Sequence, residues 1–349
     1  MRRLIAPARL GDHAERGAVA IIMAMSLVIL LVIAAWVIDG SALYQERAEL
    51  QHGADAAALA IARDCVEGAC GAVYTTADQF VDANANDGDS RVPPGGITFP
   101  DGNTVRVVVR TADAGADIDG DPTTVDYTFA RVIGFDGKEV SAIAVASWGS
   151  VGSGASIPLT VSMCEFNLAT SGGTVFASGP PFSGPPTILK FHSGGPQDPT
   201  VPCPAGPAGQ DIPGGFGWLD IDTPCSALID ENSFVGANPG NGHPGNGSLQ
   251  CSQEDFLGPN LTGHTVMLPI YNDVTGVGQP GSYRIEGFAA FHITGIRFPG
   301  GPSWRINMTV PECKNNQSCI KGYFTEDIFP GQGGPGDNEF GAKTIWLVS

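Results

Sequence analysis

The feature that most constrains the fold is an apolar run close to the start of the chain. Residues 18–38 read AVAIIMAMSLVILLVIAAWVI and contain no charged side chain. With a rise of about 1.5 Å per residue, a helix of this length matches the roughly 30 Å hydrocarbon core of a bilayer. We therefore expect one transmembrane helix, with residues 1–17 and 39–349 on opposite sides of the membrane.

The charges that flank this run predict its orientation. The preceding segment carries four arginines and two acidic residues: Arg2, Arg3, Arg9, Arg16, Asp12 and Glu15. Because basic flanks stay in the cytoplasm, we expect a single-pass protein of the cell membrane with a cytoplasmic N-terminus and an extracytoplasmic bulk. The alternative is a cleaved secretory signal, but its apolar stretch would be only about 7–15 residues long. We favour an uncleaved anchor.

All eight cysteines follow the apolar run, at Cys65, Cys70, Cys164, Cys203, Cys225, Cys251, Cys313 and Cys319. An even number in an oxidising compartment is typical of disulfides. Zinc is the weaker interpretation, because no C-x-x-C pair is present. The spacings predict local loops that join Cys65 to Cys70 and Cys313 to Cys319. Pairing of Cys203 with Cys225 and of Cys164 with Cys251 is only suggested, since eight cysteines allow 105 connectivities.

The composition limits the possible partners. The chain has 349 residues, a net charge of −18 and only 15% charged residues. A chain this acidic has no electrostatic hold on phosphate backbones, so we expect no binding to nucleic acid. Its 48 Gly and 27 Pro indicate many turns.

After the apolar run, residues 39–65 predict an amphipathic extension of the same helix. Good helix formers dominate this segment. Apolar side chains recur at helical spacing, at Leu43, Leu50, Ala54, Ala57 and Ile61. This stripe packs either on the chain's own next domain, which we favour, or on other helices of an assembly.

Two further domains are predicted. Residues 66–150 predict a small α+β unit, with helices over 75–84 and 125–133 and strands over 105–111 and 140–148. Residues 151–156 (VGSGAS) predict a linker. Residues 157–349 predict an all-β outer domain, a Gly/Pro-rich, disulfide-bonded β-sandwich or irregular barrel. Its expected strands cover 159–164, 187–192, 265–271, 283–298, 304–310, 319–324 and 344–348.

The search for reactive sites predicts no enzyme, no cofactor and no metal site. Signatures of hydrolase, nucleotide and zinc chemistry are missing from the sequence. An acidic loop holds Asp113, Asp117, Asp119 and Asp121, but Pro122 and Thr128 stand where a calcium loop needs Gly and Glu, so we favour solvated acidity.

Other candidates for chemistry have simpler interpretations. The outer domain contains four scattered histidines and two adjacent acidic pairs, namely His192, His243, His264, His292, Glu254–Asp255 and Glu326–Asp327. Adjacent residues on a strand point to opposite faces, which disfavours paired carboxylate catalysis. Trp218 is expected in a core rather than in a sugar-binding site.

The N-terminal motifs resemble those of a known family. The resemblance is carried by Arg16–Ala20, the apolar run, Asp39-Gly40-Ser41-Ala42-Leu43-Tyr44, Arg47, Leu50-Gln51 and Ala54–Ala60. This pattern resembles the TadG-like (TadE/TadG-type) proteins of Flp, or type IVb tight-adherence, pilus assembly. The motifs DGxxLY and ADAAALA are specific, because neither is needed merely to cross a membrane.

The resemblance implies a membrane-anchored structural or assembly component of a Flp/Tad pilus or a related secretion system. Other Tad/Flp pilus-assembly proteins are its implied partners, and residues 66–150 resemble the head of pilin-like proteins. Pilins that are processed carry a Glu at the fifth position after the cleavage-site Gly, whereas here Ile22 follows Gly17 at that distance. We therefore expect no pilin-type cleavage. The alternative is a membrane-anchored adhesin or ligand-binding protein that acts through the β domain.

Overall fold

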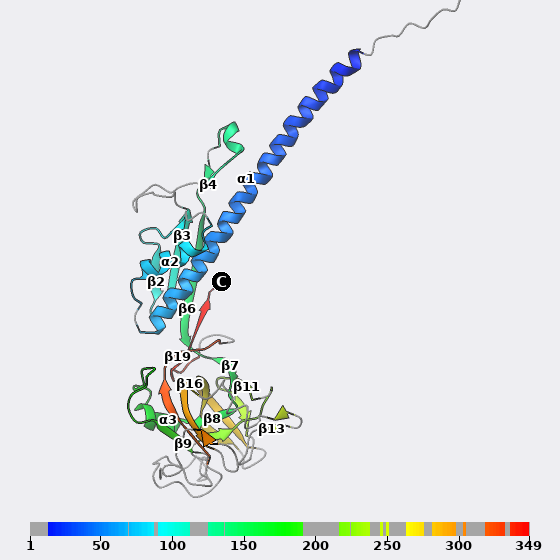
Figure 1. The fold of residues 1–349 in the computed structure, drawn as a ribbon. Coiled ribbons are helices and arrows are strands. Elements are labelled where there is room, and N and C mark those ends of the chain that lie inside the picture. The colour runs from blue at the N-terminus through cyan, green and yellow to red at the C-terminus, as the bar shows by residue number, and fades with distance from the viewer. Residues whose placement is uncertain are drawn as a thin grey trace, which may run out of the picture. The chain divides into compact units, whose positions relative to one another are not determined.

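A computed structural model describes most of the chain (Figure 1). The described residues are 13–68, 70–86, 90–111, 125–135, 137–190, 216–223, 225–237, 245–246, 249–250, 263–275, 281–297, 303–304, 318–331 and 336–348. The chain forms two compact units, residues 1–146 with 347–349, and residues 147–346. The basic flank up to residue 12, the acidic loop 113–121, His192, His243 and Glu254–Asp255 lie outside the described residues.

The first unit is built on one unbroken helix, α1 (His13–Val66). Its other elements are α2 (Val73–Asn84), β1 (Ser90–Arg91), β2 (Ile97–Asp101), β3 (Thr104–Thr111), β4 (Val125–Asp126), the 3₁₀ helix η1 (Ala130–Ile133), β5 (Gly137–Lys138) and the first part of β6 (Ser141–Ser150). Strand β3 lies between β1 and β6 and also pairs with β2, while β4 pairs with β5. The C-terminal residues return to this unit, where the Val348 N–H donates to the Val145 carbonyl at 2.8 Å.

The outer half of α1 packs on its own unit. Its stripe residues Leu50, Ala54, Ala57 and Ile61 are fully buried, and α1 contacts α2 and β3. In Figure 1 the helix runs alongside α2, β3 and β6. Strand β3 faces it with alternating buried valines, as a strand with one covered face must. This confirms the expectation that the stripe packs on the chain's own next domain.

One predicted helix of this unit is wrong. Residues 125–133 form the short strand β4 and then η1, which ends at Gly134 with φ of 92°. The cause is a competing acceptor, because the backbone N–H groups of residues 128–130 bond to the carboxylate of Asp39 on α1. The predicted helix 75–84 and the strands 105–111 and 140–148 are confirmed by α2, β3 and β6.

The second unit is β-rich around one long antiparallel pair, β15 (Thr265–Thr275) and β16 (Ser282–Arg297). Its strand order is β10–β8–β15–β16–β18–β9, with β8 parallel to β15 and with β12 and β17 also paired to β16. The remaining elements are β7 (Ser153–Ser156), β8 (Leu159–Ser162), α3 (Met163–Thr170), β9 (Thr187–Lys190), β10 (Phe216–Trp218), β11 (Ala227–Asp230), β12 (Phe234–Gly236), β13 (Gly245–Asn246), β14 (Leu249–Gln250), β17 (Ser303–Trp304), β18 (Cys319–Thr325), β19 (Asp327–Ile328) and β20 (Ala342–Leu347). Phe166, Phe291 and Phe324 meet in its core through edge-to-face ring contacts. The closed sandwich or barrel stays a prediction.

Two details of this unit correct the sequence predictions. The expected linker 151–156 contains strand β7, which pairs with β11. At Gly154 a Cβ would lie 2.8 Å from Met267 Cε, the flexible end of that side chain. The expected strand 159–164 ends at Ser162, whose hydroxyl accepts the Glu165 N–H at 3.2 Å and thereby caps helix α3.

Gly53 lies where α1 packs on α2, which yields a first prediction. A Cβ at Gly53 would lie 3.4 Å from Val81 Cα, an ordinary contact. We expect Gly53→Ala to slow amide exchange in α2 and to raise the free energy of unfolding of this unit by about 1 kcal/mol, since Gly costs a helix about that much relative to Ala. Gly53→Leu should speed exchange in α2, because a larger side chain meets the α2 backbone.

Gly40→Ala is the matched control for this experiment. Amide exchange in each variant is measured by hydrogen exchange with mass spectrometry in detergent. A Cβ at Gly40 has no heavy atom within 4 Å, so this change alters helix propensity without touching α2. Faster exchange of α2 in Gly53→Ala than in Gly40→Ala contradicts the packing described here.

Candidate functional site

The candidate site is the point where the apolar half of α1 ends. Residues 19–38 are exposed in the isolated chain except for Ala35, which is half-buried. A window of 18 residues here has a mean hydropathy of 3.0 and makes no buried contact, so this helix is long and apolar enough to cross a membrane. The next residue, Asp39, is the first charged one after the run.

The Asp39 carboxylate is almost fully enclosed, with 6% of the residue exposed. Its Oδ1 accepts the Thr128 N–H at 2.9 Å, and its Oδ2 accepts the Ala130 N–H at 2.7 Å. The Phe129 N–H lies between them, 3.3 and 3.2 Å from the two oxygens. These donors are the free N–H groups at the start of η1, so a distant side chain caps that turn.

These bonds change the titration of Asp39. Burial alone raises the pKa of this carboxyl, but the backbone N–H groups of Ala130, Phe129 and Thr128 together bring its pKa below the ordinary value. A lowered pKa in the folded state means that the stabilisation is fully present above the pKa of the unfolded chain. It is lost as pH falls through the lowered pKa.

A second acidic side chain of α1, Glu49, holds the segment that follows α2. Glu49 accepts the backbone N–H of Asn86 at 3.1 Å and also the Asn86 side-chain amide, just after α2. The Gln45 side chain donates to Glu49 at 2.9 Å, and these bonds, the Gln45 bond first, lower the pKa of Glu49. Helix α1 therefore holds two connecting segments of its unit through carboxylates.

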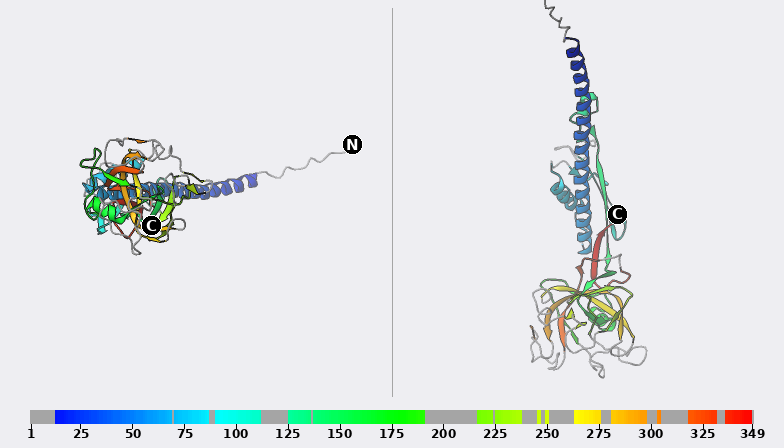
Figure 2. Two further views of the ribbon diagram at one scale, coloured as in Figure 1. Left: turned by 90° about the horizontal axis from the view of Figure 1, so that it is seen from below. Right: turned by 90° about the vertical axis from the view of Figure 1, so that its right-hand side faces the viewer.

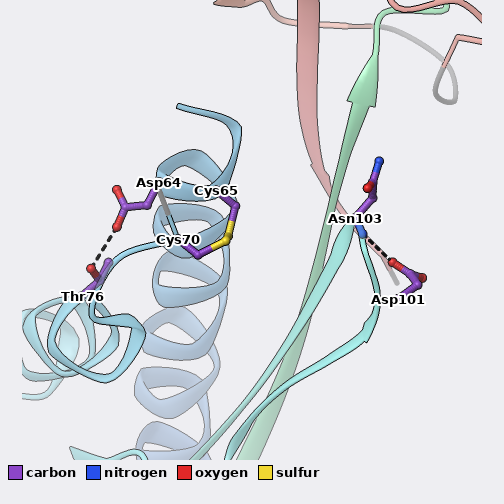
Figure 3. The surroundings of a disulfide bond; sticks show 6 residues. All are labelled: Asp64, Cys65, Cys70, Thr76, Asp101 and Asn103. Carbon is purple, nitrogen blue, oxygen red and sulfur yellow. Dashed lines mark hydrogen bonds between the residues drawn. A yellow bond between two sulfur atoms is a disulfide. The ribbon is translucent and has the colours of Figure 1, made fainter. Parts of the chain in front are cut away.

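The far end of α1 is closed by the disulfide Cys65–Cys70 (Figure 3). Next to it, the Thr76 hydroxyl donates to Asp64 Oδ2 at 2.9 Å. The two contacts tie the turn after α1 to the start of α2. This disulfide is one of the two local loops that the cysteine spacing predicts.

The other predicted cysteine sites are described in part. Cys164, Cys225 and Cys319 are disulfide-bonded, and no described cysteine is free. Cys203, Cys251 and Cys313 lie outside the described residues. The pairings suggested for these six cysteines stay predictions.

The described candidates for chemistry make ordinary structural contacts. Trp218 is buried in the core of the second unit, as expected. Glu326 forms an ion pair with Lys343 at 2.8 Å. His292 Nδ1 lies 3.2 Å from the Thr265 hydroxyl, and burial lowers the pKa of this histidine. Within the described part of the chain, no three His, Cys, Asp or Glu side chains gather as metal ligands would.

Asp39 is the residue of this candidate site that reasoning on the separate segments missed. The signal lay in the DGxxLY motif, since membrane crossing does not require an acidic residue at the end of the run. What the sequence does not show is its partner, because residues 128–130 lie about ninety positions further along the chain.

Together these features define a class: a protein with one N-terminal helix long enough to cross a membrane, which continues as the packed spine of a folded unit. Residues 17–64 match the family described as putative Flp pilus-assembly TadE/G-like. This match confirms the resemblance that the motifs indicate, and the N-terminal segment is TadE/G-like. Searches of curated proteins and of solved structures gave no match.

The contacts of Asp39 yield a second prediction. In Asp39→Ala we expect the amides of residues 128–130 to exchange faster, because they lose their acceptors. Asp39→Asn should be intermediate, since the amide keeps one acceptor oxygen and no charge. Hydrogen exchange with mass spectrometry at neutral pH on the purified chain measures this. Asp64→Ala, which removes a bond at the other end of α1, is the control and should leave these amides unchanged.

Proposed function

We propose that this protein is a membrane-anchored structural or assembly component of a Flp/Tad pilus or a related secretion system. One observation carries the proposal: the TadE/G-like match covers the helix whose apolar half is exposed and whose other half is the spine of the first unit. The match thus covers both the anchor and the face on which that unit folds. No sugar, nucleotide or metal chemistry enters the proposal, and the protein acts by binding and position rather than as an enzyme.

The orientation follows from charge. Four arginines precede the apolar run and Asp39 follows it, which supports a cytoplasmic N-terminus and extracytoplasmic units. An extracytoplasmic location also suits a chain whose described cysteines are all disulfide-bonded. The partners in this proposal are the membrane and other Tad/Flp pilus-assembly proteins.

The proposal includes an anchor that stays uncleaved. Ile22 occupies the position at which processed pilins carry Glu, and a Glu in an apolar helix is costly unless it is paired. We expect the protein purified from membranes to keep the residues before Ala18. N-terminal sequencing or intact mass measures this, and a mature chain that begins at Ala18 contradicts it.

The assembly role is tested by removing most of the second unit. A chain lacking residues 151–341 keeps α1 and also keeps β20, which leads into the C-terminal residues of the first unit. In cells that lack the native protein, we expect this chain to reach the membrane and the full chain to restore pili, counted by electron microscopy.

The outcomes of this deletion separate the two candidate functions. Loss of pili with normal membrane levels supports a role of the second unit in assembly. Normal pili with loss of attachment to surfaces supports the alternative of an anchored adhesin acting through the β domain. Pili at wild-type number in cells without any copy of the protein contradict the assembly proposal altogether.

A further inference from the structure

Strands β4 and β5 pair to form a hairpin, described at residues 125–135 and 137–138, which exposes aromatic side chains. Phe129 is 39% exposed and Phe135 is 63% exposed. They lie on either side of the turn η1, which ends at Gly134. We refer to residues 125–138 as the 125–138 hairpin. Phe135 is the more exposed of the two rings, and both belong to one short segment.

The position of this hairpin along α1 is determined by contacts. Asp39 bonds to the backbone of residues 128–130, and α1 contacts both β4 and η1. In both Figure 1 and Figure 2 the hairpin lies beside α1, further toward the N-terminal end of the helix than β2 and β3. The hairpin is therefore held at the residue that directly follows the apolar run.

The burial of α1 at Asp39 continues, in part, at Ala35. Ala35 lies one helical turn before Asp39, on the same face, and is half-buried while its neighbours in the run are exposed. One turn corresponds to about 5.4 Å along the axis. Partial burial of α1 therefore reaches one turn inside the apolar run, at Ala35 alone.

The dimensions of a bilayer place this level in the headgroup region. The interfacial zone adds roughly 5–8 Å to each side of the 30 Å hydrocarbon core. If the core ends at Ile38, then Asp39 lies within that zone and Ala35 lies at the outer edge of the acyl chains. The exposed aromatics Trp36 (80%) and Tyr44 (79%) flank the same level, as aromatic residues do at a membrane interface.

We propose that the 125–138 hairpin is a second membrane contact, in which Phe129 and Phe135 lie against the lipid of the leaflet nearest the first unit. The occupant is lipid because Asp39, which directly follows the apolar run, bonds to the backbone of the hairpin, and the medium around α1 at this level is the bilayer itself. This inference rests on the proposed anchoring by α1. Its consequence is mechanical, since a helix with a second interfacial contact has a restricted tilt and rotation.

The experiment measures lipid contact at single positions of the full chain. Cysteine is introduced at Phe135, and in separate chains at Phe99 and at Ile29, and is labelled with an environment-sensitive fluorophore. The chains are reconstituted in phosphatidylcholine–phosphatidylglycerol vesicles with or without nitroxide-bearing lipids. Native cysteines within the described residues are disulfide-bonded, and the unsubstituted chain, labelled in parallel, gives the background that is subtracted.

Phe99 is the matched control, because it is also an exposed phenylalanine of the first unit (43%) but lies on β2. Ile29 lies in the middle of the apolar run and reports insertion of α1. We expect the label at 135 to have blue-shifted emission and to be quenched by nitroxide lipids and not by iodide. The label at 99 should show the opposite pattern. Adding Asp39→Ala should lower lipid quenching at 135 and leave quenching at 29 unchanged.

The outcomes separate the inference from the proposed function. Lipid quenching at 29 together with iodide quenching at 135 overturns the second contact and leaves the anchor intact. Iodide quenching at 29 overturns the anchor itself. A label at 135 that is shielded from both lipid and iodide shows a protein partner on the hairpin, and this too overturns a lipid contact. Unchanged lipid quenching at 135 in the Asp39→Ala chain overturns the role of Asp39 as its positioning residue.

Discussion

The structure depends on one helix, α1, whose apolar half is exposed and whose other half is packed in the first unit. Helix α1 is unbroken from His13 to Val66, so its apolar half and its packed half share one rigid axis. A helix has a fixed rise and rotation per residue, and this couples the depth of the apolar run to the register of the packed stripe. The position of Leu50 against the sheet thereby also determines where Ile38 lies. The packing of the first unit therefore also sets the position of the apolar half of α1.

Asp39 stands where these two halves meet. A carboxylate at the end of an apolar run is costly to enclose unless it is compensated. Here backbone N–H groups at a 3₁₀ turn supply compensation. Neutral donors leave the negative charge in place and hold the backbone of residues 128–130 at this point of the helix. Because the donors are main-chain atoms, the residue types at 128–130 have little influence on the contact.

Much of the fold was predictable from local patterns. Strand β3 alternates buried valines, and the long strand β16 lies where the sequence predicts a strand, with residues 287–291 all buried. The predictions of local structure fail where a tertiary contact outweighs the local preference of the sequence. Residues 128–130 bond to Asp39 instead of completing a helix, and residues 153–156 pair with β11 instead of serving as a linker. The S-x-x-E cap of α3, Ser162 to Glu165, was a local signal that went unread.

The sequence by itself determined the membrane-length run, its likeness to TadE/G proteins and the helical stripe that continues it, because length, charge and periodicity are local properties. It also predicted the small loop between Cys65 and Cys70. Only the tertiary structure decided what covers the stripe and what Asp39 binds. Those partners are brought together by chain folding over some ninety residues, and no local pattern encodes which distant backbone group fills a given acceptor.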